Sequence, residues 1–378
     1  MPDEKLTAYR GGKALRRGWT TGSCAAAASQ AAAVLLLTGI APPEIHLHTP
    51  GGITFCLPVE DAHMSGNAAV CTVRKDAGDD PDITNGVRIT ASVRRIEKGV
   101  TIEGGAGVGR ITRPGLAMPV GEAAINPGPR QQIADAVHRA AQQNGYNGGF
   151  SVTISVKDGE ALATQTYNGH LGIVGGISIL GTSGIVEPMS EKALVDTIRL
   201  ELDSLYAQGQ RIAFLCQGNY GADFARDTLG LDLERAVKCS NFIGEAFDHA
   251  AYRGYPEILL VGHAGKLVKM AAGVMNTHSS VADARQEIFT AHAALCGAPR
   301  ETLEGLMAAI SVDACVELLD EVNLRQPVLS RIGREMETRI ALRMKGQARV
   351  EFIMFTGKYG VLAEPAGARA LCERLKLQ

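Results

Sequence analysis

In the second half of the chain, short apolar runs alternate with longer stretches in which apolar residues recur with helical periodicity. Residues 212–216 form a continuous apolar run of the kind that makes a buried strand, and residues 257–261 and 350–355 are apolar apart from Glu257 and Glu351. Strands that alternate with helices indicate parallel crossover units. We therefore predict a doubly wound, Rossmann-like α/β domain over residues 191–378 with a helical C-terminal part. Helices are predicted at 191–208, 241–253, 266–274, 288–296, 300–319 and 329–344.

The first half has a different pattern, with short β-like segments separated by Gly and Asp-Pro turns. A basic arm, predicted to be extended, precedes an alanine-rich helix at 25–37, which Thr21 or Ser23 can cap and Gly39 can end. The apolar core of GGISILGTSGIV reads as a buried strand between glycines, and Asp158-Gly159 as a hairpin turn. We predict an N-terminal α+β domain over residues 1–190. Its other elements are strands at 44–48, 53–59, 68–73, 86–95 and 150–156 and a helix at 131–143.

Composition narrows the class of protein. A chain of 378 residues with 46% hydrophobic and 21% charged residues is expected to fold as two soluble domains. A net charge of −2 gives no general reason to bind nucleic acid or an anionic membrane. The eight cysteines form no Cys-x-x-Cys pair and no zinc-site spacing, which predicts reduced thiols and a cytoplasmic location. We expect no signal peptide, and residues 25–37 are too few to span a bilayer.

The most informative stretch is VGHAGKLVKMAAGVMNTHSSVADARQE, residues 261–287. Its GHAG turn (262–265) and the GNYG turn (218–221) both follow predicted parallel strands, at the end of the sheet where ligands collect. Lys266 lacks the Ser or Thr that a phosphate-binding Walker loop needs at the next position, so it is either solvated or bound to a carboxylate. His263 either caps the turn or titrates near neutral pH.

A polar cluster follows the predicted helix after GHAG. Asn276, Thr277 and His278 form part of a run too polar for a core, and His278 is the candidate acid–base group. The helix between the turn and this run would be about 14 Å long, so the run should not reach the turn unless the chain folds back. Asp283 and Arg285 belong to the cluster or only cap the next helix.

Other polar groups suit an anionic ligand. Thr20, Thr21 and Ser23 either cap the alanine-rich helix or bind a carboxylate at its positive end, beside Arg16 and Arg17. Three further arginines, Arg110, Arg113 and Arg130, are candidates by the same logic, and Thr182 and Ser183 could line a pocket. The acidic turn at 75–86 is either a solvated turn or a cation site. The glycine segment GGAGVG (104–109) is either a ligand loop or a β-turn, because it does not complete the dinucleotide-binding fingerprint.

Four blocks, at residues 15–28, 109–130, 171–191 and 261–287, resemble the cobalt-precorrin-5B carbon-1 methyltransferase family of anaerobic cobalamin biosynthesis. One departure is Gly169-His170, where the family pattern has Pro-Arg. The resemblance implies an S-adenosylmethionine-dependent C-methyltransferase that converts cobalt-precorrin-5B, a tetrapyrrole with many carboxylate arms, to cobalt-precorrin-6A. Cobalt would arrive within the substrate, so no residue is predicted to bind a metal, and a homo-oligomer stays open.

For the reaction that the resemblance implies, the position and chemistry of the candidates above suggest a role for each. His278 is the predicted catalytic residue. Predicted to bind the donor are Gly218, Asn219, Gly221, Gly262, His263, Gly265 and Lys266. Predicted to bind the substrate are Arg16, Arg17, Thr20, Thr21, Ser23, Thr182, Ser183, Asn276 and Thr277.

Two other classes of function remain as alternatives. One is a nucleotide-dependent α/β enzyme such as a dehydrogenase, which a complete fingerprint with a later acidic residue would have supported. The other is a non-catalytic tetrapyrrole-binding protein. Binding of the methyl donor separates the enzyme from the carrier.

Overall fold

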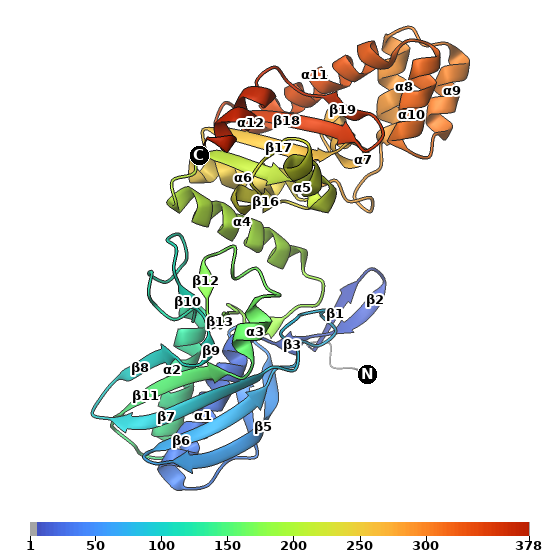
Figure 1. Ribbon diagram of the computed structural model, residues 1–378. Coiled ribbons are helices and arrows are strands. Elements are labelled where there is room, and N and C mark those ends of the chain that lie inside the picture. The colour runs from blue at the N-terminus through green and yellow to red at the C-terminus, as the bar shows by residue number, and fades with distance from the viewer. Residues whose placement is uncertain (1–5, 378) are drawn as a thin grey trace. The chain divides into compact units, whose positions relative to one another are not determined.

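The computed structural model describes residues 6–377 and divides the chain into two compact units, Met1–Glu191 and Lys192–Gln378 (Figure 1). Each unit contains helices and a sheet, so the predicted mixture of α and β structure is confirmed. Each unit also has a hydrophobic core that includes residues of its own sheet.

The N-terminal unit is built on a six-stranded sheet with the order β4-β5-β6-β7-β11-β8. Neighbouring strands are antiparallel except β11 and β8, which are parallel. The predicted strands are confirmed, although the second continues to Ser65. The bounds are β4 (Glu44–His48), β5 (Thr54–Ser65), β6 (Ala68–Arg74), β7 (Arg88–Ile96), β8 (Val100–Gly104) and β11 (Gly149–Val156).

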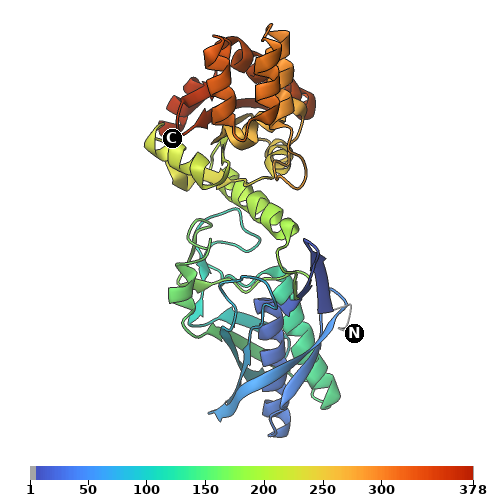
Figure 2. The ribbon, with the colours of Figure 1, turned by 90° about the vertical axis from the view of Figure 1, so that its right-hand side faces the viewer.

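Helices α1 (Thr21–Thr38) and α2 (Pro127–Gln143) lie side by side on one face of this sheet (Figures 1 and 2). Every α1 residue from Thr21 to Ala33 is buried, and its alanines leave room for close backbone approach. In the described part of the chain, only α1 has the length and composition of a membrane span, and 78% of it is buried inside the unit. That degree of burial is typical of a core helix.

The start of α1 corrects the predicted cap at Thr21 or Ser23, and its end confirms the predicted stop at Gly39. Thr20 is the N-cap, and its hydroxyl accepts a hydrogen bond from the Ser23 N–H at 3.2 Å. Thr21 and Ser23, the predicted caps, already lie inside the helix. Gly39 ends the helix in the left-handed conformation (φ 74°), as predicted.

The start of the chain corrects another prediction. The basic arm is a hairpin of β1 (Thr7–Arg10) and β2 (Lys13–Arg16), with Gly11 and Gly12 at positive φ in the turn. Two positive-φ glycines suit the twist of a tight two-residue hairpin. Basic composition alone did not reveal this pairing.

Residues 18–19 and the segments at 107–111 and 173–186 form short strands, most of which the sequence did not predict. The buried strand predicted in GGISILGTSGIV forms in part: Gly176–Ile177 are strand β13, and Ile179 pairs with Ile125. Positive φ at Gly181 and Gly184 then turns the chain before β14. Asp158 takes a left-handed conformation (φ 58°) and starts helix α3 (Gly159–Ala163), not a hairpin. The short strands are β3 (Gly18–Trp19), β9 (Gly107–Val108), β10 (Arg110–Ile111), β12 (Ile173–Val174), β13 (Gly176–Ile177) and β14 (Ile185–Val186).

The C-terminal unit contains a five-stranded sheet with the order β16-β15-β17-β18-β19. The first four strands are parallel, and β19 is antiparallel. Strands β16 and β19 were not predicted, because each is short. The bounds are β15 (Ile212–Cys216), β16 (Ala236–Lys238), β17 (Glu257–His263), β18 (Arg349–Thr356) and β19 (Gly360–Ala363).

Helices cover both faces of this sheet. Apolar side chains of α4, α6 and α11 share one core with the sheet, and those of α5 and α12 share the other. These five helices are α4 (Glu191–Ala207), α5 (Gly218–Asp227), α6 (Ile243–Arg253), α11 (Arg325–Met344) and α12 (Ala368–Lys376).

The strand order reverses between β15 and β17. From β15 the chain passes through α5 and the short 3-10 helix η2 (Leu233–Arg235) to β16 on one side, and from β16 it returns through α6 to β17 on the other. These two strands are neighbours, with Cys216 opposite Val261 in a parallel ladder. Their carboxyl ends therefore lie at a topological switch point, the usual ligand position in open α/β sheets.

Two predicted helices are interrupted. Residues 300–319 form α9 (Arg300–Ala308) and α10 (Val312–Glu321), because Ser311 caps a new helix after a break. Residues 266–274 form one turn of α7 (Ala264–Leu267) and the 3-10 helix η3 (Val268–Ala272), which Gly273 ends at φ 77°. The last predicted helix before the C-terminal strands is confirmed as α11, and 288–296 as α8 (Arg285–Leu295).

Candidate functional site

The GNYG turn is the start of helix α5 at the carboxyl end of β15. Gln217 closes the strand, and its N–H donates to the Val261 carbonyl at 2.9 Å. Gly218 has φ 65°, which favours glycine. A Cβ at Gly221 would lie 2.7 Å from the Val261 carbonyl oxygen, so this glycine permits close packing of α5 against β17.

The GHAG turn belongs to the end of β17 and the start of α7. A Cβ at Gly262 would lie 2.3 Å from Leu267 Cδ1 and 2.9 Å from Gln217 Cβ. Internal packing therefore already explains this glycine. His263 is the N-cap of α7, and its Nδ1 accepts a hydrogen bond from the Gly265 N–H at 3.1 Å. The capping interpretation of His263 is confirmed.

The environment of His263 disfavours its charged form. Burial lowers the pKa of this imidazole, and the charge of Asp313 opposes that effect only in part. The ring also meets Phe355 edge-on, with centroids 5.7 Å apart. Neutral imidazole is the form that can accept from Gly265 through Nδ1.

This gives a testable pH dependence. The pKa of His263 is lower in the folded than in the unfolded state, so the unfolded chain takes up a proton first as pH falls below about 6.5. We expect His263 to contribute stability above that pH and to lose it in acid. His263→Asn, which retains a capping oxygen, should reduce the fall in unfolding free energy between pH 7.5 and 5 in urea titrations. A slope equal to that of wild type would contradict the prediction.

Two charged groups near the GNYG turn were missed by the sequence reasoning. Lys238, at the end of β16, donates from Nζ to Asn219 Oδ1 at 3.2 Å. Burial raises the pKa of Glu201 on α4 to about 7, and the charge of Lys238 acts against this rise. No local pattern marks either residue, because β16 is short and α4 is amphipathic. Lys266 is exposed beside the GHAG turn.

The polar run folds back onto the carboxyl ends of the strands. Thr277 is 1% exposed, and its Oγ1 accepts from Gln217 Nε2 at 2.9 Å. Its N–H donates to the Asn241 carbonyl at 3.0 Å. The condition stated from the sequence is therefore met: the chain folds back after η3, which the left-handed Gly273 ends. Thr277 bonds directly to the residue that precedes GNYG.

Lys269 holds this run in place, and the sequence reasoning missed it. Its side chain is nearly buried, and Nζ donates to the carbonyls of Thr277 at 3.3 Å and Ala282 at 2.8 Å. Asp283 Oδ1 lies 3.9 Å from the same nitrogen. Burial lowers the pKa of this ammonium group. The position of this lysine inside the apolar run VKMAA could have indicated that its side chain is buried and paired.

His278 is exposed at the tip of the run. Its Nδ1 lies 2.6 Å from Ser280 Oγ and accepts from the Ser280 N–H at 3.2 Å. Its own N–H donates to Asn276 Oδ1 at 3.2 Å. When Nδ1 accepts in this way, the ring proton resides on Nε2. The imidazole is thus oriented by its neighbours and is accessible to solvent.

Asp283 and Arg285 pair with each other in front of α8. Two contacts join the guanidinium and the carboxylate, at 2.7 and 2.6 Å, and this pairing lowers the pKa of Asp283. The predicted capping is seen in part: Ala284 occupies the N-cap position, but Asp283 Oδ1 accepts from the Arg285 N–H at 3.5 Å at the start of α8.

The N-terminal candidates lie in the other unit, and both Arg16 and Arg17 already have an acidic partner. Arg16 binds Asp76 through two contacts of 2.6 and 2.8 Å, and Arg17 donates to Glu187 at 3.0 Å. In the acidic turn, buried Lys75 pairs with Asp82 at 2.6 Å. Internal ion pairs therefore explain much of the charge of this turn.

The hydroxyls at the start of α1 bind the segment before Ile185. Ser23 Oγ donates to the Gly184 carbonyl at 2.7 Å, and the Leu180 N–H donates to Thr21 Oγ1 at 2.9 Å. Both hydroxyls are buried, as is that of the capping Thr20. Thr182 and Ser183, by contrast, are exposed on this segment.

The other N-terminal candidates have structural contacts. Arg130 donates from Nε to the Ile125 carbonyl at 2.9 Å and from Nη1 to the Ile102 carbonyl at 3.0 Å. Arg110 donates to Glu103 at 3.0 Å. A Cβ at Gly107 of GGAGVG would lie 2.0 Å from the Val156 carbonyl oxygen, so close backbone packing requires this glycine.

Comparison with known proteins decides the family. The model of the CbiD family matches residues 8–188, and that of the CbiD C-terminal domain matches residues 276–366. A cobalt-precorrin-5B C(1)-methyltransferase of Ruminiclostridium cellulolyticum is 50% identical over 347 residues, 92% of this chain and 90% of the relative. The chain belongs to the CbiD family.

Further relatives carry the same name. The cobalt-precorrin-5B C(1)-methyltransferase of Alkaliphilus metalliredigens is 42% identical over 97% of this chain and 96% of its own length. That of Salmonella typhimurium is 43% identical over 88% and 86%. A solved cobalamin biosynthesis protein (cbiD) from Archaeoglobus fulgidus is 30% identical, with a TM-score of 0.41 over 75% of this chain and 88% of that chain. The family resemblance of the four sequence blocks is confirmed.

Proposed function

We propose that this chain transfers a methyl group from S-adenosylmethionine to carbon 1 of cobalt-precorrin-5B, giving cobalt-precorrin-6A in anaerobic corrin biosynthesis. The observation that carries the proposal is 50% identity, over 92% of the chain, to a relative named for this methylation. Cobalt enters as part of the substrate. We further propose that the reaction takes place in the cytoplasm, without nucleic acid or membrane partners.

The chemistry asks the protein mainly for alignment. A carbon nucleophile, the methyl group and the sulfonium sulfur must lie in line with water excluded, and such positioning can lower a barrier by about 7–11 kcal/mol. An acid–base group that removes a proton, or that holds the macrocycle in its nucleophilic tautomer, adds to this. A site without a catalytic triad is therefore adequate for methyl transfer.

We place the donor at the switch point of the C-terminal sheet, which we regard as a doubly wound, Rossmann-like domain. Supporting this are the adjacent carboxyl ends of β15 and β17 and the glycine turns that follow them. Asn219 and Lys238 present polar groups beside the first turn, and Lys266 a cation beside the second. The donor residues would be Gly218, Asn219, Gly221, Gly262, His263, Gly265 and Lys266.

The macrocycle would then meet the polar run, with His278 as the acid–base group. Supporting this is the return of the run to Gln217, next to GNYG. Within the run, Asn276 and Thr277 orient the backbone that carries His278.

In the N-terminal unit, substrate carboxylates would compete with Asp76 and Glu187 for Arg16 and Arg17. Exposed Thr182 and Ser183 remain available for direct contact. The buried hydroxyls of Thr20, Thr21 and Ser23 would act indirectly, because they hold the segment that carries this pair.

The function is tested with donor and substrate together. S-adenosylhomocysteine should bind the purified chain in calorimetric titration, and S-adenosylmethionine with cobalt-precorrin-5B should yield a product heavier by one methyl group in mass spectrometry. Tetrapyrrole binding without donor binding would instead support a carrier.

A matched pair of variants tests the place of the donor. Asn219→Ala, at an exposed position, should weaken S-adenosylhomocysteine at least about tenfold, the effect of losing about 1.4 kcal/mol of hydrogen bonding. Asp223→Asn, one turn further along α5, is the control and should bind normally. Equal affinities in all three proteins would move the donor away from GNYG. Gly262→Val is unsuitable because its side chain would overlap Leu267.

A further inference from the structure

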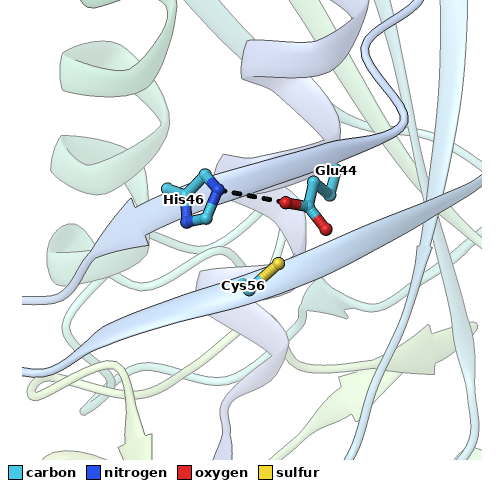
Figure 3. A group of neighbouring side chains, drawn as sticks. All are labelled: Glu44, His46 and Cys56. Atoms are coloured by element: carbon cyan, nitrogen blue, oxygen red, sulfur yellow. Dashed lines mark ion pairs between the residues drawn. The ribbon is translucent and has the colours of Figure 1, made fainter.

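Three potential metal ligands lie together on an exposed part of the N-terminal sheet. Glu44 and His46 lie on the edge strand β4, two residues apart and therefore on one face. Cys56 lies on β5 directly opposite His46 in the antiparallel ladder. Figure 3 shows the three side chains on the same side of the two strands.

Their ligand atoms converge. A carboxylate oxygen, a ring nitrogen and the thiol sulfur all lie within 4.8 Å of one another, and His46 Nε2 is 3.1 Å from Glu44 Oε1. Within residues 6–377, no other group of three or more Cys, His, Asp or Glu side chains converges to this extent. The arrangement thus differs from an ordinary surface ion pair by its thiol.

The strands beneath the cluster are fixed by packing. The alternate residues Ile45, Leu47, Phe55 and Leu57 are all buried in the core of the unit, with α1 on that face. Ligands on paired strands keep a more constant spacing than ligands on a loop. The backbone therefore presents the three groups in a set geometry, and only exposed side chains need to move.

We propose that Glu44, His46 and Cys56 bind a divalent transition metal ion of the zinc class. Thiolate and imidazole select Zn²⁺ and similar ions such as Co²⁺ over Mg²⁺ or Ca²⁺, and the carboxylate completes a neutralising set. Three protein ligands leave one tetrahedral position open to water. Metal–ligand distances of about 2.0–2.3 Å would draw the atoms closer together, which rotation of the exposed side chains allows.

Binding is accompanied by the release of one proton. Without metal, the Cys56 thiol and the Glu44 carboxylate are hydrogen-bonded, which lowers the pKa of Glu44 and raises the pKa of Cys56. The ion replaces the thiol proton: the S–H bond breaks, a sulfur–metal bond forms, and the proton goes to buffer. Nothing is oxidised or reduced. Affinity should therefore rise with pH.

Cobalt(II) tests the site because a thiolate ligand gives it a near-ultraviolet charge-transfer band. Titration of the chelator-treated full chain with Co²⁺ should produce a saturable band that Zn²⁺ displaces. Cys56→Ser should abolish the band. His46→Ala should weaken binding at least about tenfold, because removal of even an outer partner of a metal ligand costs 10–100-fold.

A cysteine control makes the assignment specific. Six of the eight cysteines are buried, and Cys296 is the other that is partly accessible. Cys296→Ser should retain the full band and affinity. A band that persists in Cys56→Ser, or that disappears in Cys296→Ser, would overturn the proposal. So would the absence of any thiolate band in wild type at a large excess of Co²⁺.

Discussion

Replacing His278 by alanine should lower the turnover number of methyl transfer by about 10²-fold or more, the usual contribution of an acid–base group. The imidazole is exposed, and Ser280 fixes its Nδ1, which leaves Nε2 to exchange a proton with the macrocycle. Donor affinity should stay nearly unchanged, because the hydrogen bonds of the imidazole go to Ser280 within its own run. Single-turnover methylation followed by mass spectrometry measures the chemical step directly.

Its neighbour provides the control. Ser279→Ala alters the same exposed run without touching the imidazole, and it should methylate at the wild-type rate. Wild-type single-turnover rates in the His278 variant would mean that the histidine is structural and that catalysis here is positioning alone. A slow Ser279 variant would attribute the loss to disturbance of the run.

Replacing Lys269 by methionine should destabilise the C-terminal unit by about 1–3 kcal/mol and loosen the polar run. The methionine fills a similar volume but cannot donate, so the carbonyls of Thr277 and Ala282 lose their partner. Urea titration should report the loss of stability. Hydrogen exchange should become faster at the amides of residues 276–284. The turnover number should also fall in this variant, because Lys269 holds the backbone on either side of His278.

Lys266 serves as the matched lysine control. It lies three residues earlier and is exposed, so Lys266→Met should change the unfolding free energy by no more than about 0.5 kcal/mol and leave the exchange of the run unchanged. Equal effects of the two substitutions on stability would show that the buried hydrogen bonds of Lys269 contribute little. Normal exchange in the Lys269 variant would show that other contacts hold the run.

These predictions depend on one feature of the fold, the return of the polar run to the strand ends. Gln217 both ends β15 and binds Thr277, so the donor turn and the run that carries His278 share a hydrogen bond network. A change in Gln217 would therefore alter both. Separate measurement of donor affinity and of the single-turnover rate distinguishes the two effects.

The sequence by itself determined the larger elements of each unit. Apolar runs marked β15 and β17, because a strand that is buried on both faces is apolar at almost every position. Alternation of apolar and polar residues marked β4 to β7, because a strand that is buried on one face is apolar at every second position. The glycine turns after β15 and β17 could also be recognised as a candidate ligand site. Strands that alternate with helices form a parallel sheet, and ligands bind at the carboxyl ends of its strands. Family membership followed from four long matching blocks, which needed no structure.

Tertiary structure decided what each polar side chain does. From the sequence, Thr21 and Ser23 were expected either to cap α1 or to bind a carboxylate. In the structure, both hydroxyls form hydrogen bonds with the segment at 180–184. From the sequence, Arg16 and Arg17 were expected to be available for substrate carboxylates. In the structure, they pair with Asp76 and Glu187, which are distant in sequence. Lys269 was missed although it stands in an apolar run, and the cluster of Glu44, His46 and Cys56 was not marked by any local sequence pattern. The physical reason is that periodicity reports burial along one element, whereas a hydrogen bond or ion pair depends on which other segment arrives beside it.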